Sequence, residues 1–499
     1  MGGTTATGLE RPLSVAEIVA GDARQLVGGD WLDTQTRIDN LDPGNGELIG
    51  TVPRGSEEDV SAAVASAVAA APAWAALSPV ARGAVLQRAA GILEPDLESW
   101  AVLVTREMGK PLLESRAEVR RTLRILHYYA GEAERATGEH FPSENPNMWV
   151  FTRREPVGVV GVITPWNFPA AIPAWKVAPA LVFGNAVVVK LADDAPLSGL
   201  VLVRALQEAG LPPGVLNAVF GDGEIVGSAI VRHPEVRAIT FTGSTRVGLQ
   251  VLGEAATRQK KIQLELGGHN PVIVCEDAHL PSAVDAVFQG AFASTGQKCT
   301  ATRRVYVQTS VAKPFLRALL ERTRSARVGY GLDPGVEVGP LVNERQLTAV
   351  LTEVERAAAL GTLHIGGSRL SDPAYPAGLF VEPAIFTDLP ATSTLACDEV
   401  FGPALGVWEY EGFDDAVAAA NTTRYGLSAA VFTRDLDRAK AFTERIKTGV
   451  VRINTQTAGI EPQVPLTGWR DSGYGQPEQG RAAIDFFTDL KTVYLNPSE

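Results

Sequence analysis

Short apolar runs rich in Val, Ile and Ala alternate with amphipathic stretches through most of the chain after residue 156. Such short runs are typical of buried strands, whereas apolar positions that recur about every three to four residues are typical of helices. The alternation favours a parallel, doubly wound α/β sheet. Its first part predicts strands at 157–163, 186–189, 216–220 and 238–241, and helices at 174–183, 197–208, 224–233 and 245–257.

A second alternation begins near residue 263 and predicts a second α/β domain of comparable size. Its strands are expected at 263–266, 272–275, 304–308 and 429–432, and its helices at 282–293, 311–326, 413–421 and 438–447. Residues 57–126 are rich in Ala, Leu, Glu and Arg at the spacing of amphipathic helices. The tail at 484–495 ends in an alternating strand with no partner nearby in sequence, so we expect that strand to pair with another subunit.

Residues 156–175 form an uncharged run of twenty residues, about the length needed to span a bilayer. The run contains four prolines, at 156, 165, 169 and 173. In a helix, proline removes a hydrogen-bond donor and clashes with the preceding turn, so a buried strand followed by a functional loop is expected instead. Residues 1–21 lack the continuous apolar core of a signal peptide, and no membrane partner is expected.

The chain carries 57 acidic and 45 basic side chains, a formal net charge of −12. This charge excludes a general polyanion binder, so nucleic acid is not expected as a partner. The three cysteines, Cys275, Cys299 and Cys397, make a disulfide framework improbable and indicate a reducing compartment, which we interpret as the cytoplasm. Their wide spacing and the lack of an H-x-x-x-H pair predict no metal site.

Cys299 lies in the polar segment FASTGQKCTATRR, just after a predicted helix and a glycine. A loop cysteine beside Lys298 is suited to a lowered pKa and to action as a thiolate nucleophile. The alternative is a buried structural thiol, which is the commoner role of a lone cysteine. The glycine-containing polar surroundings argue against apolar burial. Cys275, by contrast, ends an apolar strand and is expected in the core.

Glu265 lies inside an otherwise apolar strand, shortly before Gly267 and Gly268. Burial would raise its pKa and make it a general base, whereas on the other face of the strand it would be solvated, and spacing alone does not decide between the two. The paired glycines favour function because they let backbone or a ligand approach closely. Asn167, in TPWNFP, either donates its amide to an oxyanion or stabilises its own loop as an Asx-turn.

Two further segments have features of a nucleotide site. FTGSTRVG places Gly243 and Ser244 in a strand-to-helix turn, whose free N–H groups suit a phosphate. Lys190 ends a strand and Asp193 follows, at the edge where doubly wound sheets bind ligands; a solvated strand-end pair is the alternative. No G-x-G-x-x-G follows a predicted strand, so the usual dinucleotide fingerprint is absent.

Taken together, these motifs resemble those of the aldehyde dehydrogenase superfamily. In family order they are EMGKP at 107–111, REPVGVVGVITPWNFP at 154–169, FTGSTRVG at 241–248, and then ELGGHNP, GQKC, EVFGP and NTTRYGLSAAVFT. The resemblance extends from about residue 26 to the C-terminus. It implies oxidation of an aldehyde to a carboxylic acid, with NAD or NADP as the hydride acceptor.

The resemblance also implies a role for each catalytic residue. Cys299 would attack the aldehyde carbonyl, while the Asn167 amide and the Cys299 backbone N–H stabilise the thiohemiacetal oxyanion. Glu265 would activate the water that hydrolyses the resulting thioester, with Lys176 assisting proton movement or positioning. The residues implied to line the cofactor, on a variant Rossmann sheet, are Ile163, Thr164, Trp166, Lys190, Asp193, Gly223, Phe241, Gly243, Ser244, Val247, Leu266, Glu399 and Phe401.

Three choices within the superfamily follow from particular residues. Asp193 favours NAD over NADP because an acidic group there repels a 2′-phosphate, although the family usually has the longer glutamate and the shorter side chain relaxes this preference. Retention of Glu265 favours water over CoA as the acyl acceptor. The joint presence of Cys299, Asn167 and Glu265 argues against a non-catalytic binding protein on the same fold.

The segments AIPAWKVAPALVFGNAVVVK, GQKCTATRRVYV and EQGRAAIDFFTDLKTVY are most similar to bacterial 2-oxoglutarate semialdehyde (2,5-dioxopentanoate) dehydrogenases. The expected pocket wall is nevertheless mainly apolar, and no arginine for a distal carboxylate can be identified from the sequence. Aliphatic or aromatic aldehydes are therefore the alternative substrates. The expected wall residues are Phe168, Ala171, Ile172, Trp175, Ile460 and Leu466.

The resemblance implies an aldehyde dehydrogenase fold with these parts: an N-terminal tail at 1–25, an NAD-binding domain at 26–136 and 157–267, a catalytic domain at 268–483, and oligomerisation segments at 137–156 and 484–499. A hairpin near 137–156 would pair with the C-terminal strand of a neighbour. A homodimer or homotetramer is the expected assembly.

Overall fold

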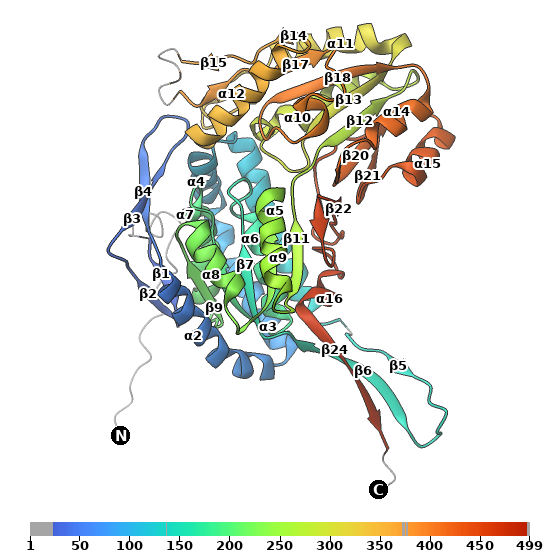
Figure 1. Ribbon diagram of the computed structural model, residues 1–499. Helices are drawn as coiled ribbons and strands as arrows, with labels where there is room; N and C mark the ends of the chain where they lie inside the picture. The colour runs from blue at the N-terminus through green and yellow to red at the C-terminus, as the bar shows by residue number, and fades with distance from the viewer. Residues whose placement is uncertain (1–22, 136, 372–374, 376–377, 497–499) are drawn as a thin grey trace.

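The computed structural model describes residues 23–135, 137–371, 375 and 378–496. Two α/β layers, each built on a large sheet, lie one above the other, and a narrow β-ribbon projects from the lower one (Figure 1). Most of the predicted N-terminal tail, 1–25, lies outside the described residues.

The first sheet has eight strands, of which the central five run parallel, as predicted for a doubly wound sheet. In spatial order the strands are β2 (Asp30–Leu32), β1 (Gln25–Val27), β9 (Leu216–Val219), β8 (Ala186–Lys190), β7 (Val159–Ile163), β10 (Val236–Thr242), β11 (Lys261–Glu265) and β23 (Gly473–Tyr474). The last of these comes from the far end of the chain, within 268–483. The expected α/β architecture is therefore confirmed, with a late segment added at its edge.

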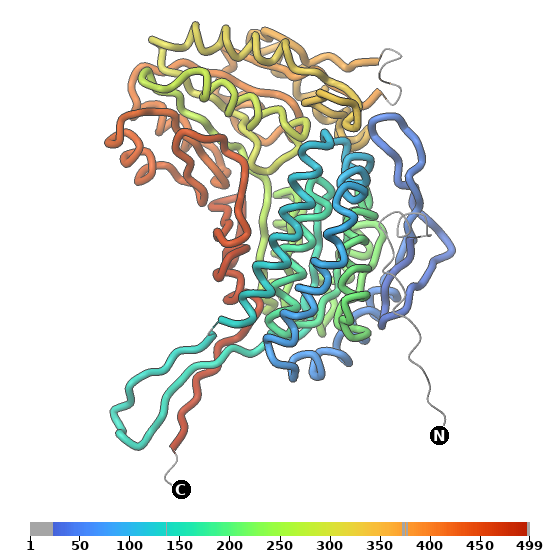
Figure 2. Tube along the Cα trace, turned by 180° about the vertical axis from the view of Figure 1, so that it is seen from behind, coloured from blue at the N-terminus to red at the C-terminus, as the bar shows by residue number. Residues whose placement is uncertain are grey.

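Helices cover both faces of this sheet because side chains alternate sides along each strand. Val187 and Val189 of β8 pack with one set of helices, whereas Ala186 and Val188 pack with the other. The first set covers the face of the sheet that is turned towards the viewer in Figure 2. It comprises α3 (Pro79–Leu93), α4 (Leu97–Met108), α5 (Leu112–Glu132), α6 (Ala171–Val182) and α7 (Pro196–Glu208). The second set comprises α2 (Glu57–Ala76), α8 (Ser228–Arg232) and α9 (Thr245–Ala256).

Most predicted elements occur within a few residues of their expected positions. The predicted helix at 224–233 is instead a π-helical turn, η2 (Gly223–Gly227), followed by the short α8. The uncharged run at 156–175 forms β7, a loop and the start of α6, as expected. Helix α2 is long and apolar enough to cross a membrane by length and composition, but it packs on the first sheet through Val60, Ala63, Val64 and Ala67.

The second sheet has seven strands and confirms the second α/β alternation. In spatial order they are β14 (Thr362–Ile365), β17 (Ala384–Thr387), β18 (Ala404–Tyr410), β13 (Thr302–Gln308), β12 (Asn270–Val274), β20 (Ser428–Phe432) and β21 (Val450–Ile453); only β14 is antiparallel to its neighbour. Its helices are α10 (Leu280–Phe292), α11 (Thr309–Arg324), α12 (Glu344–Ala358), α13 (Thr394–Cys397), α14 (Phe413–Ala420) and α15 (Leu436–Arg445).

The remaining elements are short. They are the pairs β3 (Arg37–Leu41) with β4 (Leu48–Pro53), β15 (Arg369–Leu370) with β16 (Phe380–Val381), and β19 (Tyr425–Gly426) with β22 (Trp469–Arg470), together with α16 (Ala483–Phe487) and the 3₁₀ turns η1 (Glu94–Asp96) and η3 (Ala293–Gly296).

The two sheets are joined end to end by the chain itself. β11 ends at Glu265 and β12 begins at Asn270, so the carboxyl edge of the first sheet lies against the amino edge of the second. Ligands of doubly wound sheets bind at the carboxyl edge of the strands. The connection between the sheets therefore places that edge in the interior of the molecule.

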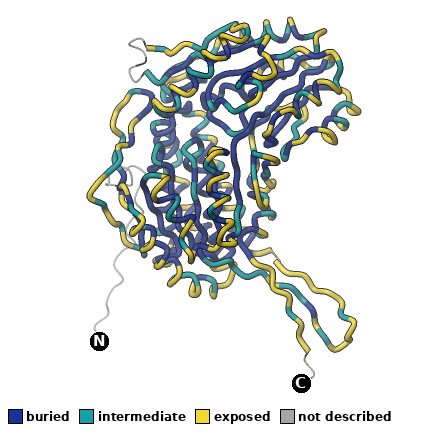
Figure 3. Tube along the Cα trace, viewed as in Figure 1, coloured by how far each residue is buried: buried dark blue, intermediate teal, exposed yellow. Residues whose placement is uncertain are grey.

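The projecting ribbon corrects one expectation. Its strands are β24 (Thr488–Leu495), β6 (Trp149–Pro156) and β5 (His140–Phe141), and β24 pairs with β6 of the same chain over its whole length. The C-terminal strand therefore finds its partner within the chain and not in a neighbour's hairpin. The reason is that α16, which precedes β24, packs on α6, so that Thr488 at the start of β24 lies directly opposite Pro156 at the end of β6. The ribbon is largely exposed, as Figure 3 shows.

The base of the ribbon depends on one buried amide, that of Asn185. Its Oδ1 accepts a hydrogen bond from the Gly158 N–H at 3.1 Å, and its Nδ2 donates to the oxygens of Ala180 and Phe487 at 3.0 and 2.9 Å. One side chain thus ties the entry to β7 to the start of β24. Each of these backbone groups would lack this partner if the amide were removed.

We expect Asn185→Ala to destabilise the folded protein by about 2–4 kcal/mol, because unpaired buried polar groups each cost about 1–3 kcal/mol. The measurement is the melting temperature and the chemical denaturation midpoint of the full-length protein. Asn147→Ala, at an exposed position of the ribbon, is the control and should leave both unchanged. Equal stability of the two variants would contradict the role given to Asn185.

Candidate active site

Cys299, Asn167 and Glu265 meet where the two sheets join. Asn167 lies in the loop after β7, Glu265 is the last residue of β11, and Cys299 lies between η3 and β13. The Asn167 amide donates to the Gln297 oxygen at 3.1 Å, and the charge of Glu265 acts on the Cys299 thiol. Residues separated by more than 130 positions are thus brought to one site, as the sequence predicts.

The loop before Cys299 has an uncommon backbone. Ser294 and Thr295 adopt positive φ angles of 53° and 55°, a conformation that non-glycine residues rarely adopt and that persists only when the surroundings hold it. Here the Ser294 N–H and hydroxyl donate to Glu114, and the Thr295 hydroxyl donates to the Gly339 oxygen at 3.0 Å. The buried loop is therefore held in place from two other segments.

The expected low pKa of Cys299 is wrong. Burial, followed by the charges of Glu399 and Glu265, raises the pKa of the thiol to about 12. The charge of Cys299 acts on Lys298, but Lys298 is not among the main influences on the thiol: its Nζ donates to the Gln289 backbone oxygen at 3.1 Å, and burial lowers the pKa of its ammonium to about 8. Adjacency in sequence therefore does not make Lys298 lower the pKa of the thiol below its usual value. The Cys299 thiol therefore needs a base that accepts its proton before it can react as a thiolate.

Of the two interpretations of Glu265, the buried one holds. Its side chain is 6% exposed, and burial, together with the charge of Glu478, raises its pKa well above the usual range of a carboxyl. The backbone N–H of Gly468 donates to it and Lys176 acts in the opposite direction, but both effects are smaller. A carboxyl with a raised pKa is suited to exchange protons near neutral pH.

The structure does not show the Asx-turn that was one of the two interpretations of Asn167. Its side chain does not close an Asx-turn within its own loop but crosses to the cysteine loop, and its Oδ1 is buried without a hydrogen-bond partner. Its backbone oxygen accepts from Lys110 at 2.7 Å. Lys110 also pairs with Glu118, whose carboxylate accepts the N–H groups of Ala170 and Ala171. This buried ion pair fixes the whole segment that carries Asn167.

Lys176 is buried and pairs with Glu478, a residue that our reading of the sequence did not single out. Lys176 also donates to the Thr240 hydroxyl at 2.8 Å, and the charges of both ionic groups act on Glu265. The sequence signal for Glu478 is weak, because a glutamate in a polar segment is ordinarily exposed. Lys110 and Glu118 were missed as well, although Lys110 lies within the EMGKP motif.

The predicted role of the paired glycines is confirmed. A Cβ atom at Gly268 would lie 2.3 Å from the Cys299 oxygen, and one at Gly267 would lie 2.3 Å from Oε2 of Glu399. Neither distance is possible for a real side chain. The Gly268 N–H also donates to Glu399 at 3.0 Å, and Asn270 donates to the Cys299 oxygen at 2.8 Å. The crossover between the sheets therefore lies in direct backbone contact with the cysteine loop.

The expected cofactor residues of the first sheet share its carboxyl edge. Lys190 donates to Asp193 at 3.1 Å, and Asp193 also accepts from the Gly221 N–H at 3.4 Å. Burial raises the pKa of the Asp193 carboxyl, although Lys190 opposes the shift. Both side chains are largely buried, so the pair is not a solvated strand end. Beside them lie Ile163 and Thr164 at the end of β7, and Gly223, around which a Cβ would find open space.

The predicted strand-to-helix turn is also present. Ser244 is the N-cap of α9 and its hydroxyl accepts from the Val247 N–H at 3.4 Å. Phe241 lies so close to Gly243 that a Cβ there would be 2.5 Å from its ring, and Leu266 packs in the same way on Gly248. The first turn of α9 thus opens at the same edge as Lys190.

Residues of the second layer complete this edge. Phe401 packs edge-to-face on Trp166 with 5.5 Å between ring centroids, and so joins the two layers. Burial raises the pKa of the Glu399 carboxyl to about 7, against the lowering effect of its bond from Gly268. Every expected cofactor residue therefore lies at or beside the junction of the sheets.

The six expected wall residues come from two segments. Phe168, under the Lys110 ammonium at 4.0 Å, precedes α6, which carries the buried Ala171, Ile172 and Trp175. Ile460 and the buried Leu466 lie in the segment after β21. That segment reaches the cysteine loop through Thr457, whose hydroxyl donates to the Thr300 oxygen at 2.7 Å. The two segments therefore approach Cys299 from both layers.

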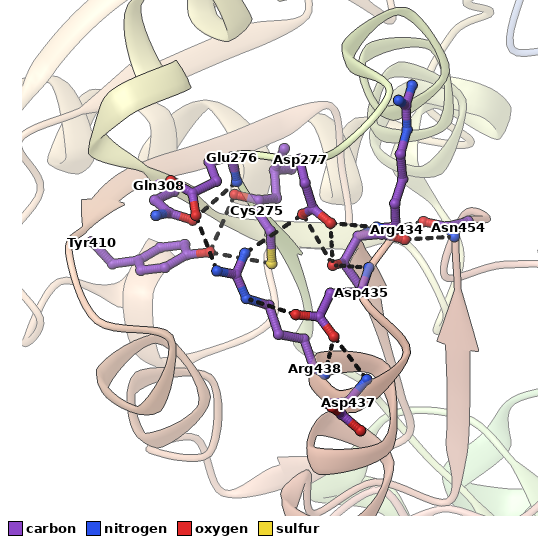
Figure 4. A network of polar contacts seen from close by, with 12 residues as sticks. Cys275, Glu276, Asp277, Gln308, Tyr410, Arg434, Asp435, Asp437, Arg438 and Asn454 are labelled. Carbon is purple, nitrogen blue, oxygen red and sulfur yellow. Dashed lines mark hydrogen bonds and ion pairs between the residues drawn. The ribbon is translucent and has the colours of Figure 1, made fainter.

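The other two cysteines have different surroundings. Cys275 is buried as expected, and burial raises the pKa of its thiol. Figure 4 shows it beside the Tyr410 hydroxyl, in a polar network with Asp277 and Arg438. This network lies at the carboxyl edge of the second sheet, opposite the edge that faces Cys299. Cys397 is exposed. Within the described parts of the chain, no group of three or more His, Cys, Asp or Glu residues is placed to hold a metal ion.

Comparison with known proteins agrees with this geometry. Residues 31–493 match the sequence profile of the aldehyde dehydrogenase family. The chain is 44% identical to alpha-ketoglutaric semialdehyde dehydrogenase of Bacillus subtilis (strain 168), over 95% of this chain and 98% of that protein. It is 41% identical to alpha-ketoglutarate semialdehyde dehydrogenase of Haloferax volcanii, with the same coverage of each chain.

Among solved structures, betaine aldehyde dehydrogenase of Staphylococcus aureus in complex with NAD⁺ superposes with a TM-score of 0.94 at 32% identity, covering 97% of each chain. The match includes both sheets and the segments that carry Cys299, Glu265 and Asn167. With a family profile that spans nearly its full length, this chain belongs to the aldehyde dehydrogenase family.

Proposed function

We propose that this protein oxidises 2-oxoglutarate semialdehyde to 2-oxoglutarate with NAD as the hydride acceptor. The observation that carries the proposal is the convergence of Cys299, Asn167 and Glu265 at the junction of the two sheets. The substrate is supported by the two semialdehyde dehydrogenases of similar sequence, since alpha-ketoglutarate is another name for 2-oxoglutarate.

In the first step, Cys299 adds to the aldehyde carbon. Because burial raises the pKa of its thiol to about 12, the proton must pass to a base, and Glu265 is the carboxylate whose charge acts on it. The negative charge then develops on the aldehyde oxygen. The Asn167 amide, held at the cysteine loop, and the Cys299 backbone N–H are the donors that stabilise it.

The residues at the carboxyl edge fit a dinucleotide. Asp193 and Lys190 offer an acceptor and a donor for ribose hydroxyls, the open space at Gly223 and the first turn of α9 admit phosphates, and Trp166 and Phe401 close the edge near Cys299. Bound NAD⁺ supplies the acceptor for the hydride that leaves the thiohemiacetal carbon. The chain's own contribution is to hold that carbon on Cys299, within the buried junction.

In the second half of the reaction, the thioester on Cys299 must be hydrolysed. Glu265 is placed to take a proton from the attacking water, and its raised pKa makes it a stronger base than an ordinary carboxylate. The buried pair of Lys176 and Glu478 lies beside Glu265 and provides a path for the proton to leave. This arrangement favours water over CoA as the acyl acceptor.

The larger organisation follows from the same proposal. We assign NAD binding to 26–136 and 157–267 and catalysis to 268–483, with β23 as the part of the latter that completes the first sheet. The exposed ribbon, with Trp149, Leu490 and Tyr494 at its surface, is the proposed contact of a homodimer or homotetramer. Three free thiols fit a reducing compartment, the cytoplasm.

The substrate is tested by the rate of NADH formation without CoA. We expect kcat/KM for 2-oxoglutarate semialdehyde to exceed that for succinate semialdehyde, aliphatic aldehydes and benzaldehyde, each by about tenfold or more, which requires only about 1.4 kcal/mol of differential binding. A preference for benzaldehyde or long aliphatic aldehydes would contradict the proposed substrate and favour the apolar alternative. Activity only with CoA present would contradict hydrolysis.

The roles of the two central residues are tested by the pre-steady-state burst. Glu265→Gln should retain a burst of NADH but release acid about 100-fold or more slowly, because removing a general base costs about 10²–10⁴-fold. Cys299→Ala, the control, should show no burst at all. A Cys299→Ala enzyme with normal turnover would overturn the mechanism.

The pH dependence follows from the same carboxyl. Only the deprotonated form of Glu265 acts as a base and its pKa is raised, so kcat should increase as the pH rises through that value. This rise should disappear in Glu265→Gln.

The cofactor preference is tested with Asp193→Ala. Removing a carboxylate that would face a 2′-phosphate should increase the ratio of kcat/KM for NADP to that for NAD by about tenfold or more, since two like charges at close range cost a few kcal/mol. Asp194→Ala, which removes the neighbouring carboxylate, is the matched control and should leave the ratio nearly unchanged. Equal ratios in wild type and Asp193→Ala would show that Asp193 does not determine the preference.

A further inference from the structure

Two half-buried arginines, Arg121 on α5 and Arg452 on β21, come from the two different layers. Within the described residues, neither guanidinium makes a hydrogen bond or an ion pair. The Nε of Arg452 is fully buried without a hydrogen-bond partner. An arginine in such a position ordinarily has its donors satisfied by carboxylates or carbonyls, because unpaired buried donors cost free energy.

Arg121 lies on the helix that packs against α6, which carries three residues of the expected pocket wall. Glu118, one helical turn earlier, accepts the N–H groups of Ala170 and Ala171 at the start of α6. At the other end of α5, Ala130 and Ala133 contact Gly83, and the adjacent Arg82 donates to the Val182 oxygen at the end of α6. The two helices therefore run side by side in the same direction. This parallel course places Arg121 level with the turn of α6 that carries Trp175.

Trp175 adds a second donor without a partner. Its side chain is 8% exposed, and its Nε1 is buried with no hydrogen bond. Buried tryptophan N–H groups usually find an acceptor. An unpaired polar donor in an otherwise apolar wall, on the helix that packs against the helix of Arg121, indicates that the acceptor is a ligand.

Arg452 reaches the same region from the second layer. It is the penultimate residue of β21, the strand that leads to Thr457, which contacts the cysteine loop, and to Ile460 of the expected wall. Its Nη2 would lie 4.0 Å from a Cβ at Gly459, the residue before Ile460. The guanidinium is therefore beside the wall segment and not on the outer face of the second sheet.

The charges of the two arginines act on each other and share one exposed counter-charge. Burial lowers the pKa of both guanidiniums; Arg452 also acts unfavourably on Arg121, while Glu461 acts favourably on both. Glu461 is exposed and accepts a hydrogen bond from Gln463. The two arginines therefore form a local positive site in a protein of net charge −12. An anion bound between the two guanidiniums would reduce their repulsion and stabilise both.

We propose that Arg121 and Arg452 together bind the distal carboxylate of an aldehyde acid while its aldehyde group reaches Cys299. This inference rests on the proposed function and names the residues that would select its substrate. A planar guanidinium offers paired donors that match the two oxygens of a carboxylate. The Trp175 N–H is the third donor, available to the 2-oxo oxygen next to that carboxylate. The clamp supplies the arginines that the sequence alone did not identify.

The test compares two five-carbon substrates that differ in the distal group, 2,5-dioxopentanoate and pentanal, with succinate semialdehyde as a shorter acid. Arg121→Gln and Arg452→Gln should each lower the ratio of kcat/KM for the acid to that for pentanal by about 10- to 100-fold, mainly through KM, because each removes a charge-assisted hydrogen bond. Arg121→Lys and Arg452→Lys should give intermediate ratios, since lysine keeps the charge but not the fork.

Arg124→Gln is the matched control, because Arg124 is exposed, lies on the same helix and carries the same charge. Its ratio should equal that of the wild type. If Arg124→Gln lowers the ratio as much as Arg121→Gln, general attraction of anions explains the effect and the clamp is overturned. If the glutamine variants melt at lower temperature than the wild type, the lysine variants provide the deciding ratios, because they keep both the length and the charge of the side chain.

The remaining outcomes separate the clamp from the proposed function. A wild-type enzyme that prefers 2,5-dioxopentanoate and variants that keep this preference would overturn the clamp alone. A wild-type enzyme that prefers succinate semialdehyde, with the preference lost in both variants, would support the clamp and overturn the identity of the substrate. A wild-type preference for pentanal would overturn both.

Discussion

The active site depends on one close backbone contact, between the crossover that joins the two sheets and the loop that carries Cys299. Gly267 and Gly268 lack the Cβ atoms that would lie 2.3 Å from Glu399 and from the Cys299 oxygen. Asn270 then fastens the same oxygen with a hydrogen bond of 2.8 Å. Because this contact sets the distance between the sheets, it also determines where the end of β11 lies relative to the cysteine.

Burial of ionisable groups is the direct consequence of that contact. The junction excludes water, and the pKa values of Cys299, Glu265 and Glu399 are all raised for the same reason. The cationic groups nearby are held by specific acceptors, as Lys110 is by Glu118 and Lys176 is by Glu478. Pairing offsets part of the cost of removing these charges from water, so the ion pairs that position the loops also stabilise the buried site.

Much of the fold could be predicted from the alternation of short apolar runs and amphipathic stretches. The core strands β7, β8 and β12 are nearly continuous apolar runs because helices cover both faces of each sheet. The prediction was wrong for the C-terminal strand, which pairs with β6 of its own chain. Local pattern shows that a strand has an open edge, but the identity of its partner depends on how α16 and α6 pack.

By itself, the sequence determined the two α/β alternations, the family resemblance and the chemical identity of the residues expected to react, since Cys299, Asn167 and Glu265 stand in recognisable local motifs. Only the tertiary structure decided that Lys298 donates to the Gln289 backbone oxygen while the pKa of the Cys299 thiol stays raised, and that Lys176 pairs with Glu478. It also brought the charges of Arg121 and Arg452, from different layers, close enough to act on each other. The physical reason is that pKa values and ion pairs depend on burial and on distances in space, which are set by the packing of segments hundreds of residues apart and are not encoded in any local pattern.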